Sequence, residues 1–322
     1  MSLLIVVINF RTPQLTIDCL SSVAAQIDQV PGTRLALVDN GSPDDSPALL
    51  AQAIARNGWA WITLIRSPVN RGFAGGNNLA LQSLQTLHPD ASFVLLLNSD
   101  TILLPGALPY CVQKMQGDAS VGLMSCLLLN ADQTVQNTAR KMPTPLRLAA
   151  CSFGLPWLFP RAFAWANLDD PGWDRRTEVR NVDWVGGAFM LIRRQVLERI
   201  GLLDDRFFFY GEDAEFCHRV RKHGWWVRYD SGAAVVHRAA ASSDAAMLPA
   251  SRRTALVWQA RYLLQRRCFG LPAELLIRFL DIAASTLRYF KLLIRGRKNT
   301  PQGAAQRDLL ALLLRWPVAG KG

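Results

Sequence analysis

The chain has 322 residues, of which half are hydrophobic and 19% are charged. This composition excludes a disordered or fibrous chain and indicates a globular protein of one large domain or two small ones. The net charge of +11 is unevenly spread, because residues 1–250 hold 22 basic and 22 acidic side chains whereas residues 251–322 hold 14 and 3. The whole excess of positive charge therefore lies in the C-terminal tail.

Cysteine spacing and apolar runs both argue against an exported or membrane-spanning chain. The six cysteines are scattered and form no Cys-x-x-Cys pair, which favours reduced thiols in a cytosolic compartment over disulfides or a zinc site. The N-terminal run Leu3–Ile8 is too short for a signal peptide and lacks a preceding basic segment. No stretch reaches the ~18 apolar residues that a spanning helix needs. We expect a cytoplasmic chain that does not cross a bilayer.

Strand and helix patterns alternate through the N-terminal third. Apolar runs that end in polar residues predict strands, and apolar residues at helical spacing predict helices between them. The predicted strands are 3–8, 34–38, 59–65 and 93–97, and the predicted helices are 16–26, 48–57 and 77–87. This alternation predicts an α/β fold with a doubly wound, mostly parallel sheet and flanking helices.

The alternation stops near residue 115. Residues 131–182 are rich in Pro, Trp and Arg, which predicts long loops with short helices that shape a second binding surface. Regular patterns then return, and they predict strands over 184–192 and 233–236 and helices over 194–200 and 214–223.

Polar residues with possible functions follow three predicted strands. Asp100 comes just after Phe93–Leu97, whose five consecutive apolar residues indicate a strand buried on both faces. Because open α/β sheets bind ligands at the carboxyl ends of their strands, Asp100 is a candidate ligand of a divalent cation that holds a phosphate. Asp39 could accept a hydrogen bond from a nucleobase or a ribose. His237 matters only if it lies near Asp100. Either aspartate could instead belong to a polar turn.

A glycine-rich segment, Asn70–Asn78, joins the third predicted strand to the next helix. Its glycines would let backbone N–H groups approach a ligand closely, and a helix start offers partial positive charge to a phosphate. The segment is neither a P-loop nor a Gly-x-Gly-x-x-Gly motif. A tight structural turn is the alternative.

Three carboxylates within four residues follow an aromatic run, and they are Glu212, Asp213 and Glu215. Such groups repel one another unless they cap a helix or act together. Capping would stabilise the helix predicted over 214–223 through its dipole. A carboxylate held at a helix start is also fixed and ionised, and this is what a general base requires. Capping and catalysis are therefore compatible.

Together and in this order, these pieces resemble the family 2 glycosyltransferases of the GT-A fold, in particular the rhamnosyltransferase-like branch. The resemblance covers residues 3–240, and no single motif would suffice for it. The matching motifs are Val7-Ile8-Asn9-Phe10, Val38-Asp39-Asn40-Gly41-Ser42, Asn70 to Asn78, Leu97-Asn98-Ser99-Asp100, Gly186-Gly187-Ala188-Phe189 and Gly211-Glu212-Asp213.

The resemblance implies a role for each candidate residue. Asp100 and His237 would hold Mg²⁺ or Mn²⁺, and Asp213, with Glu212 beside it, would be the catalytic base. The residues around the donor nucleotide would be Asn9, Asp39, Asn70, Arg71, Gly72, Gly76, Asn77 and Ser99. The usual Asp-x-Asp is here Asn98-Ser99-Asp100, which predicts weak metal binding in the absence of nucleotide.

The resemblance also implies an activity and a division of the chain. The expected enzyme is an inverting, metal-dependent glycosyltransferase that uses a nucleotide-sugar donor, dTDP-rhamnose first and a UDP-sugar next. The acceptor would be a hydroxyl of a glycan or a lipid-linked glycan in cell-surface polysaccharide assembly. Residues 1–115 would bind the nucleotide sugar, residues 116–245 would hold the acceptor and the base, and residues 246–322 would form a basic helical tail.

Within the tail, residues 272–297 carry apolar side chains at helical spacing. The opposite face is filled by Arg278, Asp281, Ser285, Arg288, Lys291 and Arg295. This pattern predicts a basic amphipathic helix. One interpretation is binding to an anionic membrane surface through residues 252–298, at the inner face of the cell membrane. The other is packing on the catalytic domain or on a second subunit, so self-association stays open.

Two other functions fit part of the pattern. A nucleotidyltransferase would need a basic residue in a glycine-rich loop near the N-terminus, where residues 9–14 offer only Arg11. A non-enzymatic module could bind nucleic acid through the basic tail, in which aromatic residues are interleaved. That function would leave the aspartates of the predicted site unexplained, so we expect no nucleic-acid partner.

Overall fold

A computed structural model describes residues 2–83, 86, 88–170, 172–238 and 250–315. By their contacts the residues form two compact units. The first unit comprises residues 1–141 and 169–253, and the second comprises residues 142–168 and 254–322. The predicted division into a nucleotide-sugar half, an acceptor half and a tail concerns function and stays a prediction.

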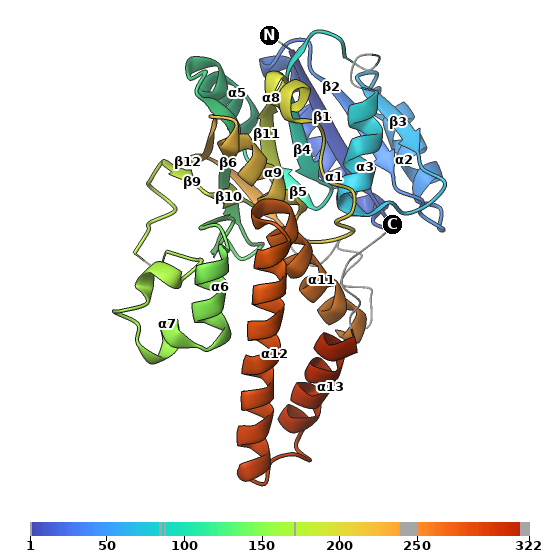
Figure 1. Cartoon of the computed structure of the whole chain (residues 1–322). Helices are drawn as coiled ribbons and strands as arrows, with labels where there is room; N and C mark the ends of the chain where they lie inside the picture. Colours follow the sequence, from blue (N-terminus) through green and yellow to red (C-terminus); the bar gives the residue numbers. More distant parts are fainter. Residues whose placement is uncertain (1, 84–85, 87, 171, 239–249, 316–322) are drawn as a thin grey trace. The chain divides into compact units, whose positions relative to one another are not determined.

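The N-terminal part of the first unit is the predicted parallel sheet (Figure 1). Its central strand β1 (Ser2–Asn9) pairs in parallel with β2 (Arg34–Asp39) and β4 (Ala91–Asn98), and β3 (Ile62–Arg66) pairs with β2. The helices between these strands are α1 (Pro13–Ala24), α2 (Ser46–Arg56) and α3 (Gly72–Gln82). The predicted alternation is confirmed. Because the four strands run the same way, their carboxyl ends share one edge of the sheet.

Several predicted elements start at other residues than expected, and the strand predicted over 233–236 already starts at Trp226. Strand β3 starts later, because the N–H of Ile62 donates to the carbonyl of Trp59 (3.1 Å) and closes a turn. Helix α3 starts earlier, at Gly72, whose φ of +68° favours glycine. The side chain of Asn70 accepts from the N–H of Gly72 (2.8 Å), and the Asn40 amide donates to the carbonyl of Gly72 (3.1 Å). Most of the predicted glycine loop is therefore the first part of a helix.

The second half of the sheet is mixed. Strand β11 (Phe189–Arg193) lies antiparallel between β4 and β6 (Val121–Leu129), and β12 (Trp226–His237) pairs in parallel with β6. Three short strands complete the sheet by antiparallel pairing, namely β5 (Thr101–Leu103), β7 (Val135–Gln136) and β9 (Arg180–Val182). The α/β class is confirmed, but the sheet is parallel mainly in its N-terminal half.

Further short elements complete the first unit. The helices are α5 (Ala107–Gly117), α8 (Arg194–Ile200) and α9 (Glu212–Lys222), and a two-stranded sheet pairs β8 (Ala139–Arg140) with β10 (Trp184–Val185). The strand predicted over 184–192 is thus two strands, β10 and β11. They are separated at Gly187, where an added Cβ would lie 2.9 Å from the ring of Phe73.

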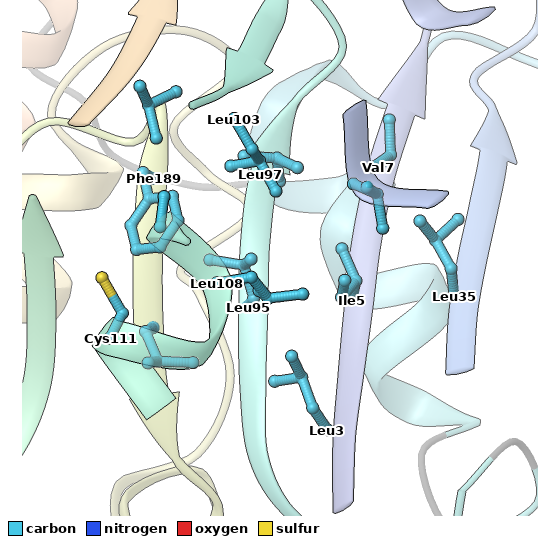
Figure 2. Close-up of a cluster of buried hydrophobic side chains, with 14 of the residues drawn as sticks. Leu3, Ile5, Val7, Leu35, Leu95, Leu97, Leu103, Leu108, Cys111 and Phe189 are labelled. Atoms are coloured by element: carbon cyan, nitrogen blue, oxygen red, sulfur yellow. The ribbon is translucent and has the colours of Figure 1, made fainter. Parts of the chain in front are cut away.

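The core of the first unit has one apolar layer on each face of the sheet. Figure 2 shows Ile5 of β1 and its register partner Leu95 of β4 in the same cluster as Leu108 of α5. The next residues along these strands, Leu4 and Val94, belong to the cluster on the other face. Strands β1 and β4 are therefore buried on both faces, as the apolar run before Asp100 predicts. Such strands form a stiff support for the polar edge.

The second unit is helical. It contains α6 (Pro145–Ser152), α7 (Leu155–Leu158), most of α11 (Ala250–Phe269), α12 (Leu271–Ile294) and α13 (Pro301–Arg315). Figure 1 shows α13 running back alongside α12. Its small apolar core consists of Leu148, Tyr262, Ile277 and Leu313.

The predicted amphipathic helix exists as α12, but half of its predicted polar face is buried, whereas Arg288, Lys291 and Arg295 on that face are exposed. Arg278, Asp281 and Ser285 are 7%, 5% and 1% exposed. The apolar face is open to solvent at Leu275, Leu276, Phe279, Leu287, Phe290 and Ile294. A surface helix of a soluble protein usually does the reverse.

None of the helices in the described part of the chain is both long and apolar enough to cross a membrane. All six cysteines lie in that part and are free thiols.

Candidate active site

Two residues that are predicted to bind the donor nucleotide lie together at the edge of the parallel sheet. The amide nitrogen of Asn9 donates to Asp39 Oδ1 (2.8 Å), and the hydroxyl of Thr16 donates to Asn9 Oδ1 (2.9 Å). The second carboxylate oxygen of Asp39 accepts from the N–H of Ser42 (3.2 Å). Asn9 and Asp39 are 0% and 2% exposed. The structure brings the two residues together at the ends of β1 and β2, and their predicted contacts with a nucleoside stay predictions.

A cavity of about 550 Å³ lies in the first unit and collects most of the other candidates. It is lined by strand ends, by the start of α3 and by the start of α9. The predicted site residues that line it are Gly72, Asn77, Ser99, Asp100, Glu212, Asp213 and His237. The predicted residues that do not line it are Asn9, Asp39, Asn70, Arg71 and Gly76.

Asp100 and His237 lie side by side in this cavity. His237 ends β12 and pairs in register with Thr101 of β5, the residue after Asp100. This pairing brings Nε2 of His237 to 3.2 Å from Oδ1 of Asp100, a carboxylate that is 2% exposed. The side-chain nitrogen of Asn98 lies 3.3 Å from the same Nε2. The proximity on which the metal prediction depends is therefore present.

The chemistry of this pair fits a divalent cation that is shared with a ligand. A carboxylate oxygen and an imidazole nitrogen are both metal ligands. Within the described ranges, no group of three or more His, Cys, Asp or Glu side chains could hold a metal ion. A magnesium-type ion bound by one or two protein groups takes its remaining ligands from phosphates and water. The pair thus suits an ion whose coordination a diphosphate completes.

The residues of the glycine-rich segment have separate surroundings. Asn77 is 1% exposed, and its amide donates to the carbonyl of Phe73 (3.0 Å). Gly76 lies inside α3, where an added Cβ would come within 3.0 Å of Ile8, so its missing side chain allows α3 to pack on β1. Arg71 is exposed, and its Nε donates to the hydroxyl of Ser67 (3.2 Å). Of this segment only Gly72, Phe73 and Asn77 line the cavity.

Asp213 is held in one orientation at the start of α9. One carboxylate oxygen accepts from the N–H of Ala214 (2.8 Å) and the other from the N–H of Gly187 (3.2 Å). Burial raises the pKa of Asp213, whereas these two N–H groups and, less strongly, Arg140 act to lower it. Gly211, just before the helix, has a φ of +95°, which favours glycine. The sequence therefore builds a fixed carboxylate that faces the cavity.

Glu212 differs from its neighbour. It is 6% exposed, and its Oε2 has no hydrogen-bond partner among the described residues. Burial raises the pKa of Glu212 well above its ordinary value, and the charge of Asp213 raises it further. Because Asp213 has two backbone donors and Glu212 Oε2 has none, we expect Asp213 to carry the charge and Glu212 to keep a proton.

The third carboxylate of the acidic cluster has a structural role. Both oxygens of Glu215 accept from Nε of Arg219, at 2.8 and 3.0 Å. The remaining nitrogens of Arg219 donate to the carbonyls of Ile200 and Leu202. This ion pair ties α9 to the end of α8 and leaves Glu215 out of the cavity.

Sequence reasoning missed several residues around the cavity. Gln136 of β7 lies 2.6 Å from Nδ1 of His237. Trp184 and Arg140 line the cavity from the small β8–β10 sheet, with the guanidinium 5.7 Å from the indole centre. Trp184 could have been found from the sequence, because it begins the predicted strand that contains the Gly186-Gly187 motif. Gln136 and Arg140 lie in the region interpreted as loops, where the sequence carries no signal for them.

The fold is that of the GT-A glycosyltransferases, as predicted. The chain is similar to a mannosyltransferase from Pyrobaculum calidifontis, solved in complex with GDP-Man and Mn²⁺ (TM-score 0.60, 16% identity, 97% of this chain and 84% of that chain). It is also similar to GalNAc-T7, solved with UDP, GalNAc and Mn²⁺ (TM-score 0.53, 11% identity, 82% and 50%). At these identities the likeness concerns the fold.

The sequence comparison defines the family. The chain belongs to the glycosyltransferase-like family 2, whose family model matches residues 2–259. It is therefore a glycosyltransferase, and membership of this family favours glycosyl transfer over the nucleotidyl-transfer and nucleic-acid-binding alternatives.

Curated relatives confirm the resemblance to the rhamnosyltransferase-like branch. An N-acetylglucosaminyl-diphospho-decaprenol L-rhamnosyltransferase of Mycobacterium tuberculosis is 27% identical over 218 residues, which are 64% of this chain and 67% of that protein. Rhamnosyltransferase WbbL of Escherichia coli is 24% identical over 202 residues, 61% and 71% of the two chains. A low-salt glycan biosynthesis hexosyltransferase of Haloferax volcanii is 29% identical over 162 residues, half of this chain and 47% of that protein.

Proposed function

We propose that the chain is an inverting, metal-dependent transferase that moves L-rhamnose from dTDP-rhamnose to a hydroxyl of a lipid-linked glycan in cell-surface polysaccharide assembly. The observation that carries the proposal is that Asp100 of the β4–β5 turn, His237 of β12 and Asp213 of α9 line one cavity. The similarity to two rhamnosyltransferases, one named for a diphospho-decaprenol acceptor, supports the choice of sugar and acceptor.

The donor nucleotide is proposed to lie at the edge of the parallel sheet. Asp39 would accept the N3–H of a pyrimidine, and Asn9 would hold that carboxylate in place. The remaining contacts are assigned to Asn70, Arg71, Gly72, Gly76, Asn77 and Ser99. Since thymine and uracil present the same N3–H, a UDP-sugar is the alternative donor.

The reaction is a displacement at the anomeric carbon. Mg²⁺ or Mn²⁺, held by Asp100 and His237, would supply positive charge to the departing diphosphate. The oxygen of the acceptor hydroxyl forms the new bond to the anomeric carbon while the bond from that carbon to the diphosphate breaks. Asp213 accepts the proton that the hydroxyl loses. Attack from the face opposite the leaving group inverts the configuration. Two backbone N–H groups keep the Asp213 carboxylate oriented for this transfer.

A lipid-linked acceptor requires the enzyme to work next to a membrane. The positive charge of the tail supports placement at an anionic surface through residues 252–298, at about 1 kcal/mol per basic residue that reaches the surface. We assign this surface to the cytoplasmic face of the cell membrane. Residues 1–115 are assigned to the nucleotide sugar, residues 116–245 to the acceptor and the base, and residues 246–322 to membrane association.

The test is a panel of nucleotide sugars offered with and without Mn²⁺, scored by thermal stabilisation and by slow hydrolysis of the donor. We expect the largest response with dTDP-rhamnose plus metal. In Asp100→Ala the metal-dependent stabilisation should disappear. In Asp213→Asn binding should survive while turnover falls by about 100-fold or more.

An exposed aspartate outside the cavity serves as the matched control, and Asp28→Asn should behave as the unchanged chain. A larger response to UDP-sugars would replace the donor assignment. Equal loss of donor binding in both active-site variants would overturn the separate roles given to Asp100 and Asp213.

A further inference from the structure

The exposed side of α12 carries large apolar residues. Phe279, Leu287, Phe290 and Ile294 are 66%, 61%, 58% and 74% exposed. Scattered single apolar residues on a surface need no explanation, but these recur at helical spacing along more than half of one helix. We therefore expect a partner to cover this face.

Two polar residues of α12, Asp281 and Ser285, are already bound within the second unit. Nε and Nη2 of Arg261 both donate to Asp281, at 2.9 Å each, and the hydroxyl of Ser152 donates to the same carboxylate. Gln306 of α13 donates to the hydroxyl of Ser285 (2.6 Å). Rotating the helix to hide its apolar face would break these buried contacts. The apolar face is thus held outward.

A second group of exposed aromatic residues lies in the same unit. Trp157 is 84% exposed, Phe159 is 57% exposed and Trp165 is 41% exposed, in the segment from α7 to residue 165. Aromatic side chains of this kind favour the boundary between lipid headgroups and acyl chains.

Charge decides which partner fits. The C-terminal end of α12 and the turn after it carry Lys291, Arg295, Arg297 and Lys298, all exposed. A second copy of the chain would bring a tail with the same excess of positive charge and would be repelled. An anionic bilayer is complementary to both features, because it offers acyl chains to the apolar face and phosphates to the cations.

We propose that α12 lies in the interface of an anionic bilayer with its apolar face among the acyl chains, and that the exposed aromatic residues of 157–165 form a second point of insertion. This deepens the membrane association in the proposed function by naming the inserted side chains. It also makes insertion, and not charge alone, the source of binding.

The test uses the full chain and vesicles, without any nucleotide sugar, so that its result is independent of transferase activity. Binding to vesicles of phosphatidylglycerol and phosphatidylethanolamine should exceed binding to phosphatidylcholine vesicles. Phe279→Ser with Phe290→Ser should weaken binding about tenfold or more, even at low salt. Trp226→Ser, which removes an exposed aromatic side chain from the first unit, is the matched control and should change nothing.

Salt distinguishes insertion from charge attraction. A substantial part of the binding should persist at 0.5 M salt in the unchanged chain, and that part should be lost in the double variant. Binding that salt abolishes completely, or that the double variant retains, overturns the proposal. A stable dimer in solution that is lost in the double variant would also overturn the proposal, because the apolar face would then bind a second copy of the chain.

A separate observation concerns the orientation of His237. Its Nδ1 lies 2.6 Å from Oε1 of Gln136, and Nε2 of Gln136 donates to Oδ1 of Asn130 (2.9 Å). The Asn130 amide nitrogen donates to the hydroxyl of Thr134 (2.9 Å), which in turn donates to the carboxylate of Asp132 (2.6 Å). These residues form a continuous chain of hydrogen bonds from the β6–β7 turn to the cavity.

The Asp132 carboxylate, at the far end of this series of hydrogen bonds, sets the direction of every hydrogen bond in the series. An ionised carboxylate only accepts, so the single hydroxyl proton of Thr134 points to Asp132. Thr134 must then accept from Asn130, Asn130 from Gln136, and Gln136 from Nδ1–H of His237. Nε2 is then the nitrogen left to bind a metal. The Asn98 amide nitrogen, 3.3 Å away, can donate to its lone pair, whereas Oδ1 of Asp100, 3.2 Å away, competes for a proton there.

We infer that Gln136 is a positioning residue that fixes the Nδ1–H tautomer of His237. The inference concerns residues that the metal assignment in the proposed function relies on, but its first test needs no metal. Imidazole ¹⁵N shifts of the metal-free chain should show Nδ1 protonated and Nε2 unprotonated in neutral His237. In Gln136→Leu the proton should move in part to Nε2, whereas Gln136→Glu, which still accepts at Nδ1, should restore the original signals.

Calorimetry with Mn²⁺ in the presence of dTDP measures the effect of these substitutions on metal affinity. Gln136→Leu should weaken Mn²⁺ binding about 10-fold to 100-fold, and Gln136→Glu should recover most of the loss. Gln133→Leu, an exposed glutamine of the same turn, is the control and should leave tautomer and affinity unchanged. An unaltered tautomer in Gln136→Leu would overturn the inference whatever the enzyme's activity.

Discussion

In the first unit apolar side chains fill the interior and polar ones gather at one edge, whereas in the second unit helix α12 buries polar side chains beside a small apolar core and leaves a row of apolar ones exposed. Leu95 and its neighbours on β1 and β4 are fully buried on both faces of the sheet. In the second unit Asp281 and Arg278 are buried, while Phe279 between them is exposed. The first arrangement suits water as the solvent and the second suits a lipid boundary.

The largest effect should come from the interior of the first unit. Leu95→Ala removes buried methyl groups and leaves a cavity that the surrounding side chains cannot easily fill, because the strand is packed on both faces. We expect a loss of about 3 kcal/mol in the free energy of unfolding. Urea denaturation in the absence of lipid measures it. A loss below about 1 kcal/mol would contradict the view of this sheet as a stiff platform.

A smaller effect should follow from opening the polar interior of the second unit. Asp281→Ala leaves Arg261 without its carboxylate, and because the Arg261 side chain keeps 23% exposure we expect a loss of about 2 kcal/mol. Denaturation of the double variant Arg261→Leu with Asp281→Leu separates charge from packing, because it removes both ions together. We expect the double variant to lose less than the single one. An equal or larger loss would mean that the ion pair itself stabilises this unit.

Much of the first unit was predictable because its signals are local. The run Phe93–Leu97 is long enough to identify a strand buried on both faces, and the polar residues after such runs mark the functional edge. The start of α3 was not predictable, because it depends on Asn40, which is distant in sequence from Gly72. Local patterns cannot report a hydrogen bond between the end of β2 and the start of α3.

The site and the tail show the same limit. Asp100, Asp213 and His237 could be singled out because each follows or begins a recognisable element. Gln136 could not, because its contact with His237 arises only when β7 and β12 both join β6. The helical period of α12 was visible in the sequence, but which face it buries depends on Ser152 and Arg261, which lie on other helices.

Glu212, the buried carboxyl group beside the proposed base, is an exception to the apolar interior of the first unit. Its effect on stability should depend on pH. Burial raises the pKa of Glu212 above its ordinary value of 4.5, so its protonated form is the one the fold favours. Its contribution to stability is complete below that value and is lost as pH rises through the folded-state pKa. Glu212→Gln cannot ionise and should therefore gain stability relative to the unchanged chain as pH rises from 5 to 8.

Thermal unfolding across this pH range measures the difference between the two proteins, with Glu198→Gln, an exposed carboxyl, as control. A constant difference between the unchanged chain and Glu212→Gln would contradict the raised pKa. Because Glu212 and Asp213 interact, a divergence reports the titration of the pair, which Glu212→Gln reduces to that of Asp213 alone.

The smallest effect should come from the apolar face of α12 in water, and it is the sharpest test of the contrast between the two units. Phe279 is as apolar as Leu95, but it is 66% exposed, so Phe279→Ala removes little buried area. We expect its free energy of unfolding to change by no more than about 0.5 kcal/mol, against about 3 kcal/mol for Leu95→Ala. Urea denaturation without lipid compares the two directly. A loss near that of Leu95→Ala would mean that Phe279 is covered in solution, and the second unit would then have no apolar surface to offer a bilayer.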